Sequence, residues 1–157
     1  MEQSSMQLPE WTRVTEVELI YKTNIKASER PKVNSSKDIY HILRQLWDEN
    51  KIEMLEEFKV LLLNRGNRII GLYEVSSGGI TGTVADPRLI LAAALKSLSV
   101  AIVLCHNHPS GNLTPSRADE QMTRKIKEAA AFHDITVLDH IILTSEAYYS
   151  FADEGLL

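Results

Sequence analysis

The sequence has a single cysteine, Cys105, among its 157 residues. One cysteine cannot form a disulfide within the chain, and it excludes the common structural zinc sites built from two, three or four cysteines. A zinc site within one chain would therefore use histidine and carboxylate ligands. Cys105 itself ends an apolar run, where a buried small hydrophobic residue is the favoured interpretation.

Long apolar segments and an excess of positive charge are also missing. Apolar runs such as Leu89–Leu95 are far shorter than the roughly 20 residues of a membrane span, and Met1–Ser5 lacks the features of a secretory signal. Lys plus Arg number 17 against 21 for Asp plus Glu, so the net charge of -4 argues against broad capture of a phosphate backbone. We expect a cytoplasmic protein with no membrane partner, in which only local basic patches could contact nucleic acid.

Two histidines, a serine and a carboxylate lie close together in the segment that starts at His106-Asn107-His108. Val100–Cys105 is an apolar run that predicts a strand, and residues i and i+2 of a strand point the same way, so His106 and His108 can face one point. A turn-rich loop follows, and Ser116 then opens a helical pattern with Asp119 in its first turn. Two imidazoles and one carboxylate match a catalytic zinc, which uses about three protein ligands and leaves a position for water. The segment therefore predicts a hydrolytic zinc site at His106, His108 and Asp119.

The same segment has a purely structural interpretation. Ser116 and Asp119 approximate the Ser-x-x-Asp capping box that begins many helices. The two roles can coexist at Ser116, because its oxygen can accept the Asp119 amide while its proton remains free to donate. The structural alternative for the histidine pair is a surface strand end.

Periodicity and turn residues predict the other elements of a single domain, which at 157 residues and 44% hydrophobic composition can bury a self-sufficient core. The expected strands are Val14–Tyr21 after a loose arm, Glu56–Asn64 and Arg68–Val75 joined by a hairpin turn at Arg65–Asn67, and Ile135–Leu143. The expected helices run from Ser35 or Ser36 to Glu49, from Leu89 to Leu98 after Asp86-Pro87, from Ser116 to His133, and from Ser145 to Ala152. Ser76–Gly79 is expected to be a loop, and the stretch from Gly78 to Thr83 is a plain connector or a flap near the cleft.

Three segments together resemble the JAB/MPN (JAMM) metalloprotease fold, and specifically its bacterial RadC-like branch. They are Glu56–Asn64, Cys105–Asp119 and Leu138–Ile142. The resemblance implies an α+β, three-layer α/β/α-like domain with a curved mixed sheet flanked by helices, a cytidine-deaminase-like architecture. It covers residues 35–157 and leaves residues 1–34 as an N-terminal arm and strand.

The resemblance also implies the roles of the site residues. His106, His108 and Asp119 would bind Zn2+, Glu56 would act as general acid/base on the zinc-bound water, and Ser116 would donate to the oxyanion. Glu57 is the alternative to Glu56, and the two exclude each other because successive strand residues point to opposite faces. Independently of the resemblance, Asp139 and His140 could orient a metal-binding histidine, since metal-bound imidazoles usually donate their other N–H to a carboxylate or carbonyl; the alternative is a structural hydrogen bond in the sheet.

The family implies a zinc-dependent metallopeptidase or isopeptidase acting on an extended peptide or protein substrate. The alternative is a RadC-type interaction module in DNA repair or mobile-element biology with little or no peptidase activity. The first thirty residues leave no room for the helix-hairpin-helix DNA-binding domain of full-length RadC. We also expect a homodimer.

Overall fold

The computed structural model describes residues 18, 20–78 and 84–157. This part of the chain forms an α+β domain built on a mixed five-stranded sheet, with strand order β2-β1-β3-β4-β5. The α-helices are α1 (Ser36–Leu46), α2 (Pro87–Lys96) and α3 (Arg117–Ala131), and a short 3-10 helix, η2, spans Ala27–Glu29. The strands are β1 (Glu57–Leu63), β2 (Ile69–Ser77), β3 (Ala101–Asn107), β4 (Thr136–Leu143) and β5 (Tyr148–Ser150). The expected strand at 14–21 and the flap at 78–83 lie largely outside the described residues.

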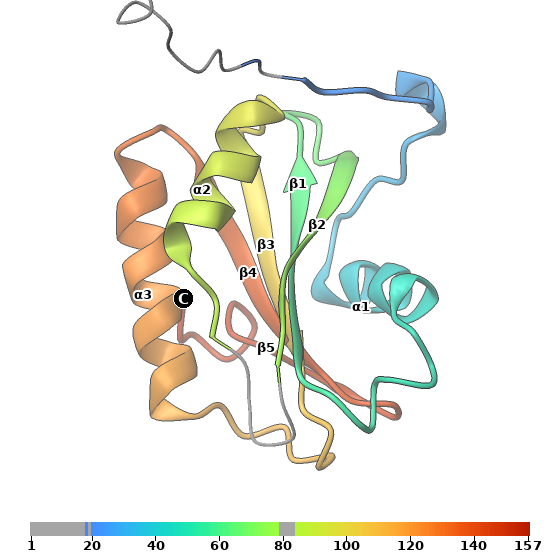
Figure 1. Ribbon diagram of the computed structural model, residues 1–157, viewed down its shortest axis with the longest axis vertical. Coiled ribbons are helices and arrows are strands. Elements are labelled where there is room, and N and C mark those ends of the chain that lie inside the picture. Colours follow the sequence, from blue (N-terminus) through green and yellow to red (C-terminus); the bar gives the residue numbers. More distant parts are fainter. Residues whose placement is uncertain (1–17, 19, 79–83) are drawn as a thin grey trace, which may run out of the picture.

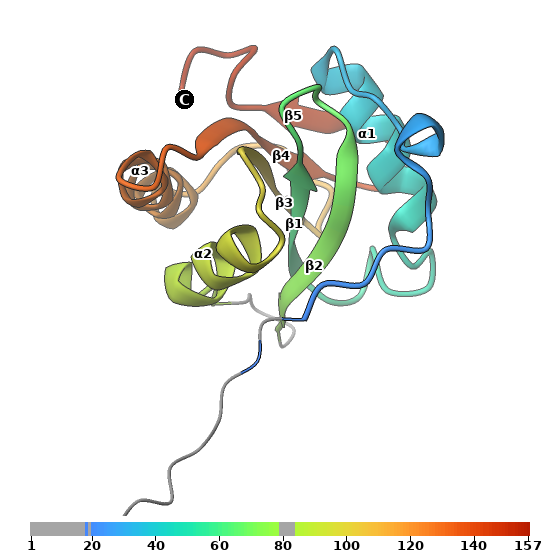
Figure 2. The same cartoon turned by 90° about the horizontal axis from the view of Figure 1, so that it is seen from above.

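The sheet is covered by helices on both faces, with α1 on one face and α2 and α3 on the other (Figure 1, Figure 2). All residues of β3 are buried, and successive side chains of a strand point to opposite faces. Both faces of the sheet must therefore be covered, which explains the three layers. Val103 and Cys105 belong to the core that includes α1, whereas Ile102 and Leu104 belong to the core that includes α2 and α3. His106 has the parity of Leu104 and therefore faces α3.

Strand pairing brings three chain segments to one end of the sheet. β1 runs antiparallel to β3, so Phe58 near the start of β1 pairs with His106 near the end of β3. β3 and β4 are parallel, and α3 makes the crossover between them. Three parts of the fold therefore meet at this end of the sheet: the end of β3, the start of β1 and the first turn of α3. Ligand-binding residues lie at such a position in many sheets with parallel strands.

Most of the expected elements are confirmed, with small shifts at their ends. Ser35 caps α1 by accepting the amide of Asp38, although this helix stops at Leu46 and not at Glu49. The antiparallel hairpin of β1 and β2 is confirmed, and its turn contains Asn67 with a positive φ of 54°. β2 continues through Ser77, which pairs with Glu57, so the loop expected from residue 76 begins later.

The helix expected at residues 145–152 is wrong. Tyr148–Ser150 instead form β5, which pairs antiparallel with β4 and places Tyr149 opposite Ile142. Tyrosine fits a half-buried pleated surface well, and pairing with the edge of β4 outweighs the local helical preference of the preceding Glu-Ala.

Among the helices of the described residues, none combines the length and the apolar character needed to cross a membrane.

Candidate metal centre

His106, His108 and Asp119 converge at the end of the sheet where β3 ends and α3 begins. Each offers a ligand atom, and these atoms all lie within 4.8 Å of one another. The Nε2 atoms of the two histidines are 3.0 Å apart, and Asp119 Oδ1 lies 3.3 Å from His106 Nε2. Asp119 Oδ2 lies 3.7 Å from His108 Nε2. The three residues thus form a group that can bind a metal ion.

These separations fit a small tetrahedral cation. Ligands placed about 2.0 to 2.1 Å from a tetrahedral zinc lie roughly 3.3 Å from one another. The two Nε2 atoms, 3.0 Å apart, and Asp119 Oδ1, 3.3 Å from His106 Nε2, lie near that value, whereas the 3.7 Å separation from His108 Nε2 is to the other carboxylate oxygen, Oδ2. The donor set of two imidazoles and one carboxylate also leaves room for a further, non-protein ligand, as catalytic zinc sites do.

The loop after β3 fixes the ring of His108. The backbone amide of His108 donates to the carbonyl of Leu143 in β4, which anchors the residue to the sheet. Its Nδ1 lies 2.5 Å from the carbonyl of Asn112 and must donate to it, because a carbonyl can only accept. Gly111, with a φ of 80°, supplies the left-handed turn that brings this carbonyl back. Nε2 of a neutral His108 therefore carries the lone pair that faces the site.

The electrostatics of the three residues favour cation binding. Burial lowers the pKa of His106 to about 4, so this ring is neutral near pH 7. Burial also lowers the pKa of His108, but its interactions with Asp119 and Asn112 and the charge of Glu56 outweigh burial and raise it overall. Burial raises the pKa of Asp119, yet the two histidines and Ser116 hold it well below its ordinary value. Asp119 is thus ionised at any physiological pH.

Ser116 and Asp119 form the capping box, and they do so while Asp119 faces the histidines. Ser116 Oγ accepts the Asp119 amide at 3.1 Å, while Asp119 Oδ2 accepts both the amide and the hydroxyl of Ser116, each at 2.7 Å. Oδ1 is the oxygen nearer to His106. The expectation that the Ser116 proton remains free is therefore wrong for this arrangement, because the ionised carboxylate takes it.

Glu57 is the first residue of β1, and because successive strand residues point to opposite faces, its neighbours Glu56 and Phe58 are expected on the other face. Glu57 is buried on the α1 face, where its carboxylate lies 3.4 Å from Lys59 Nζ, and this ammonium in turn lies 4.3 Å from the centre of the Trp47 ring. Phe58 pairs with His106 and stacks on its ring at 5.8 Å, so Glu56, two residues before Phe58, belongs to the metal side. The charge of Glu56 contributes to the raised pKa of His108. Glu56 is thus the glutamate near the metal group.

Asp139 and His140 have different partners. Asp139 accepts from Ser150 Oγ and from the amides of His140 and Ala152, which makes it a structural brace between β4 and β5. His140 is fully buried, and its Nε2 lies 2.8 Å from Nδ1 of His106. Burial and the neighbouring His106 hold the pKa of His140 well below its ordinary value. Of Asp139 and His140, His140 is therefore the one that contacts a metal-group histidine.

Cys105 takes no part in the metal group. It is fully buried on the opposite face of β3, and its Sγ donates to the carbonyl of Lys59. Burial raises the pKa of its thiol, so the thiolate form is suppressed. This agrees with the expectation of a buried small hydrophobic residue.

A polar cleft of about 260 Å³ opens beside His108. Its lining includes Glu53, Ser110, Thr144 and Glu146. The cleft gives access from solvent to the exposed side of the metal group, since the side chain of His108 keeps 15% of its surface accessible.

Comparison with known proteins agrees with this geometry. A family profile described as RadC-like JAB domain matches residues 33–156. A UPF0758 protein of Flavobacterium johnsoniae is 46% identical over 125 residues, which cover 80% of this chain and 53% of that protein. A UPF0758 protein of Porphyromonas gingivalis is 48% identical over 103 residues, covering 65% of this chain and 45% of that protein. A third, of Trichlorobacter lovleyi, is 41% identical over 120 residues, covering 76% of this chain and 50% of that protein. The chain spans about half the length of these curated relatives.

Proposed function

The chain belongs to the RadC-like JAB domain family, and on that premise we propose that it is a zinc-dependent metallopeptidase or isopeptidase. The observation that carries the proposal is the convergence of His106, His108 and Asp119, whose ligand atoms lie within 4.8 Å of one another, together with the charge of Glu56, which helps to raise the pKa of His108. Two imidazoles, one carboxylate and an open side match the ligand set of hydrolytic zinc enzymes.

A zinc ion held by these three residues would supply Lewis acidity toward a substrate carbonyl and would lower the pKa of a water to about 7. We propose Glu56 as the general acid/base, because its carboxylate would take a proton from the attacking water and deliver it to the leaving amine. Its charge contributes to the raised pKa of His108, which supports a position of the carboxylate near the metal group. Glu57 is excluded from this role because its side chain is buried with Lys59 on the other face.

Ser116 is the residue we propose to stabilise the oxyanion. Its hydroxyl now donates to Asp119 Oδ2 at 2.7 Å. Rotation about the Cβ–Oγ bond would redirect the proton toward a substrate oxygen, while Oγ still accepts the Asp119 amide and Asp119 Oδ2 keeps the Ser116 amide as its donor. One such donor contributes about 3 to 4 kcal/mol to transition-state stability in other hydrolases.

An extended peptide is the proposed substrate. β2 is an edge strand of the sheet, and its last residue, Ser77, pairs with Glu57, next to Glu56. A peptide that added to this edge would run toward the acid/base, with main-chain hydrogen bonds supplying affinity. The polar cleft beside His108 would receive the part of the substrate beyond the scissile bond.

Metal content and peptide hydrolysis, measured in parallel, test the proposal. Protein purified without chelator or nickel resin should contain about one zinc per chain, and Asp119→Ala should contain almost none, because catalytic zinc needs about three protein ligands. The zinc-loaded wild type should hydrolyse members of a peptide library that the Asp119→Ala variant leaves intact. A wild type that takes up no zinc after reconstitution would contradict the proposal.

A further inference from the structure

A chain of hydrogen bonds runs from the metal group into the core through two residues outside that group, His140 and Thr123. His106 Nδ1 lies 2.8 Å from His140 Nε2, and His140 Nδ1 lies 2.5 Å from Thr123 Oγ1. Thr123 Oγ1 lies 2.7 Å from the backbone carbonyl of Asp119, one helical turn earlier in α3. The chain thus begins at one metal-group residue and ends on the backbone of another.

The direction of each bond in this chain follows from its far end, and the 3.0 Å contact between the Nε2 atoms of His106 and His108 then requires His108 to be the donor. The carbonyl of Asp119 can only accept, so the single proton of the Thr123 hydroxyl is donated to it. Thr123 Oγ1 must then accept from His140 Nδ1–H. His140 is fully buried and its ring stacks on Phe151 at 4.6 Å, which disfavours a charged ring. A neutral His140 with its proton on Nδ1 has a bare Nε2 and accepts from His106 Nδ1–H.

We infer that Thr123 and His140 are positioning residues that hold His106 with its proton on Nδ1 and its lone pair on Nε2, toward the metal position. The inference rests on the proposed metal-binding role of His106. It assigns to Thr123 and His140 the part that carboxylates or carbonyls play beside many metal-bound histidines. His108 reaches the same tautomer by another route, its donation to the carbonyl of Asn112.

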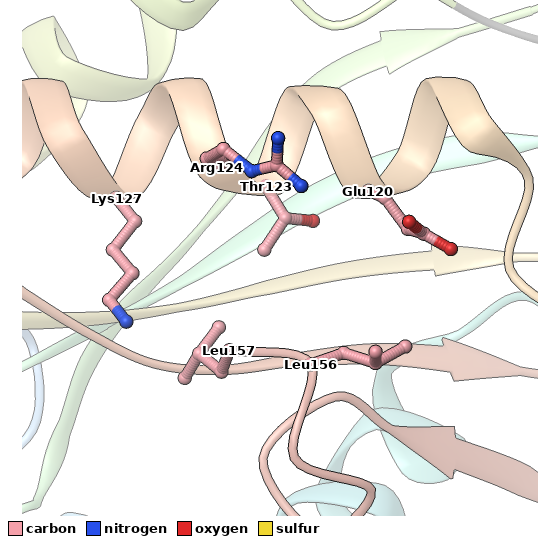
Figure 3. Close-up of a pocket in the computed structure, with 6 residues that line it drawn as sticks. All are labelled: Glu120, Thr123, Arg124, Lys127, Leu156 and Leu157. Atoms are coloured by element: carbon pink, nitrogen blue, oxygen red, sulfur yellow. The ribbon is translucent and has the colours of Figure 1, made fainter.

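Thr123 is well shielded for this role. It is only 2% exposed, yet it borders a pocket of about 240 Å³ between α3 and the C-terminal residues Leu156 and Leu157. Figure 3 shows Thr123 pointing from α3 toward these two leucines, between Glu120 and Lys127. Substitution at Thr123 therefore alters the hydrogen-bond chain from its outer end without touching a metal-group side chain.

Removal of the Thr123 hydroxyl should reverse the direction of the hydrogen bond between His140 and His106. In a Thr123→Val variant, the branched shape is retained but His140 Nδ1–H loses its acceptor. The proton of His140 is then better placed on Nε2, where it donates to His106 Nδ1. His106 in turn carries its proton on Nε2, at the position a metal must occupy. Thr123→Ser keeps the hydroxyl and is the matched control.

The test reads the tautomers directly in metal-free protein with ¹⁵N-labelled histidine, by NMR near neutral pH. In the wild type and in Thr123→Ser, His106 should show a protonated Nδ1 and a bare Nε2, and in Thr123→Val the two should exchange. A second variant, His140→Phe, keeps an aromatic ring but offers no acceptor, and it should free His106 from the Nδ1–H form. Circular dichroism confirms that each variant is folded.

Zinc titration supplies a second readout. Thr123→Val and His140→Phe should bind zinc about 10- to 100-fold more weakly than the wild type, whereas Thr123→Ser should remain within a few-fold. A His106 proton on Nε2 in the wild type, or unchanged tautomer and affinity in both variants, would overturn the inference. Because the NMR experiment needs neither metal nor substrate, its failure is distinct from a failure of the proposed peptidase activity.

Discussion

The side-chain oxygen of Asn107 accepts the backbone amide of Glu57 at 2.8 Å. The amide nitrogen of the same side chain donates to the carbonyls of Ile52 and Leu55, both at 2.7 Å. Asn107 is fully buried and lies between the two metal-group histidines in sequence. It points to the face opposite to theirs, so it ties the segment that carries Glu56 to the strand that carries the metal group.

Replacement of this brace should destabilise the fold more than it disturbs the metal group. Asn107→Ala leaves one amide and two carbonyls without their partner, and we expect a loss of about 2 to 4 kcal/mol in the free energy of unfolding, measured by urea denaturation. Zinc content should stay near the wild-type value. The exposed Asn50→Ala is the control and should change stability by no more than about 0.5 kcal/mol. Equal unfolding midpoints for the two variants would contradict the role of Asn107.

Glu56→Gln should separate catalysis from metal binding. The amide cannot take a proton, so turnover of a peptide substrate should fall by about 10² to 10⁴-fold, while zinc content remains that of the wild type. Glu57→Gln is the matched control, because the neighbouring side chain is buried with Lys59 on the other face. It should keep turnover within a few-fold. A larger loss of turnover in Glu57→Gln than in Glu56→Gln would reverse the assignment.

Two substitutions at Ser116 separate its cap from its hydroxyl. Ser116→Ala loses both, and should cost about 1 kcal/mol of stability and 10² to 10³-fold in kcat. Ser116→Gly loses the hydroxyl but remains a tolerable N-cap, so its stability should fall by only a few tenths of a kcal/mol. Equal losses of kcat with unequal thermal midpoints are the expected result. If kcat instead followed stability across the pair, Ser116 would act only as a cap.

Local sequence signals were sufficient to predict much of the fold and the metal group. Asp86 before Pro87 predicts the start of α2, and Ser116 predicts the start of α3, because capping depends on residues within a few positions of one another. His106 and His108 share a face because β3 is a strand, and the helix start at Ser116 brings Asp119 to them. Each of these relationships spans few residues.

The residues that sequence reasoning missed depend on contacts across the fold. The side chain of Asn107 donates to carbonyls more than fifty residues earlier in the chain, and no local sequence pattern predicts those hydrogen bonds. Nothing in the sequence around Thr123 distinguishes it from other residues of its helix. The packing of α3 on β4 is what shows that its hydroxyl forms a hydrogen bond with His140. β5 was missed for the same reason, since its pairing with β4 decides its conformation.

The pH dependence of zinc binding follows from His108. Its pKa is raised above 6.5 in the folded, metal-free protein, so the protonated ring contributes stability that is fully present below its unfolded pKa and is lost as pH rises through the folded pKa. The lowered pKa of Asp119 acts oppositely, since its contribution is present above its unfolded pKa, 3.8, and is lost as pH falls through the folded one. The interaction between protonated His108 and ionised Asp119 thus stabilises the fold between the folded pKa of Asp119 and the folded pKa of His108.

Zinc must displace the His108 proton to use its Nε2, whereas His106, with a pKa of about 4, is already neutral in this window. Calorimetric titration in buffers of different ionisation enthalpy, run below the pKa of about 7 of a zinc-bound water, should therefore show release of about one proton per zinc below the folded pKa of His108, and less as pH rises through it. His41→Ala, at an exposed site on α1, should leave this profile unchanged. A proton release that did not vary with pH would show that His108 is not the group that zinc displaces, because no other member of the metal group changes its protonation in this range.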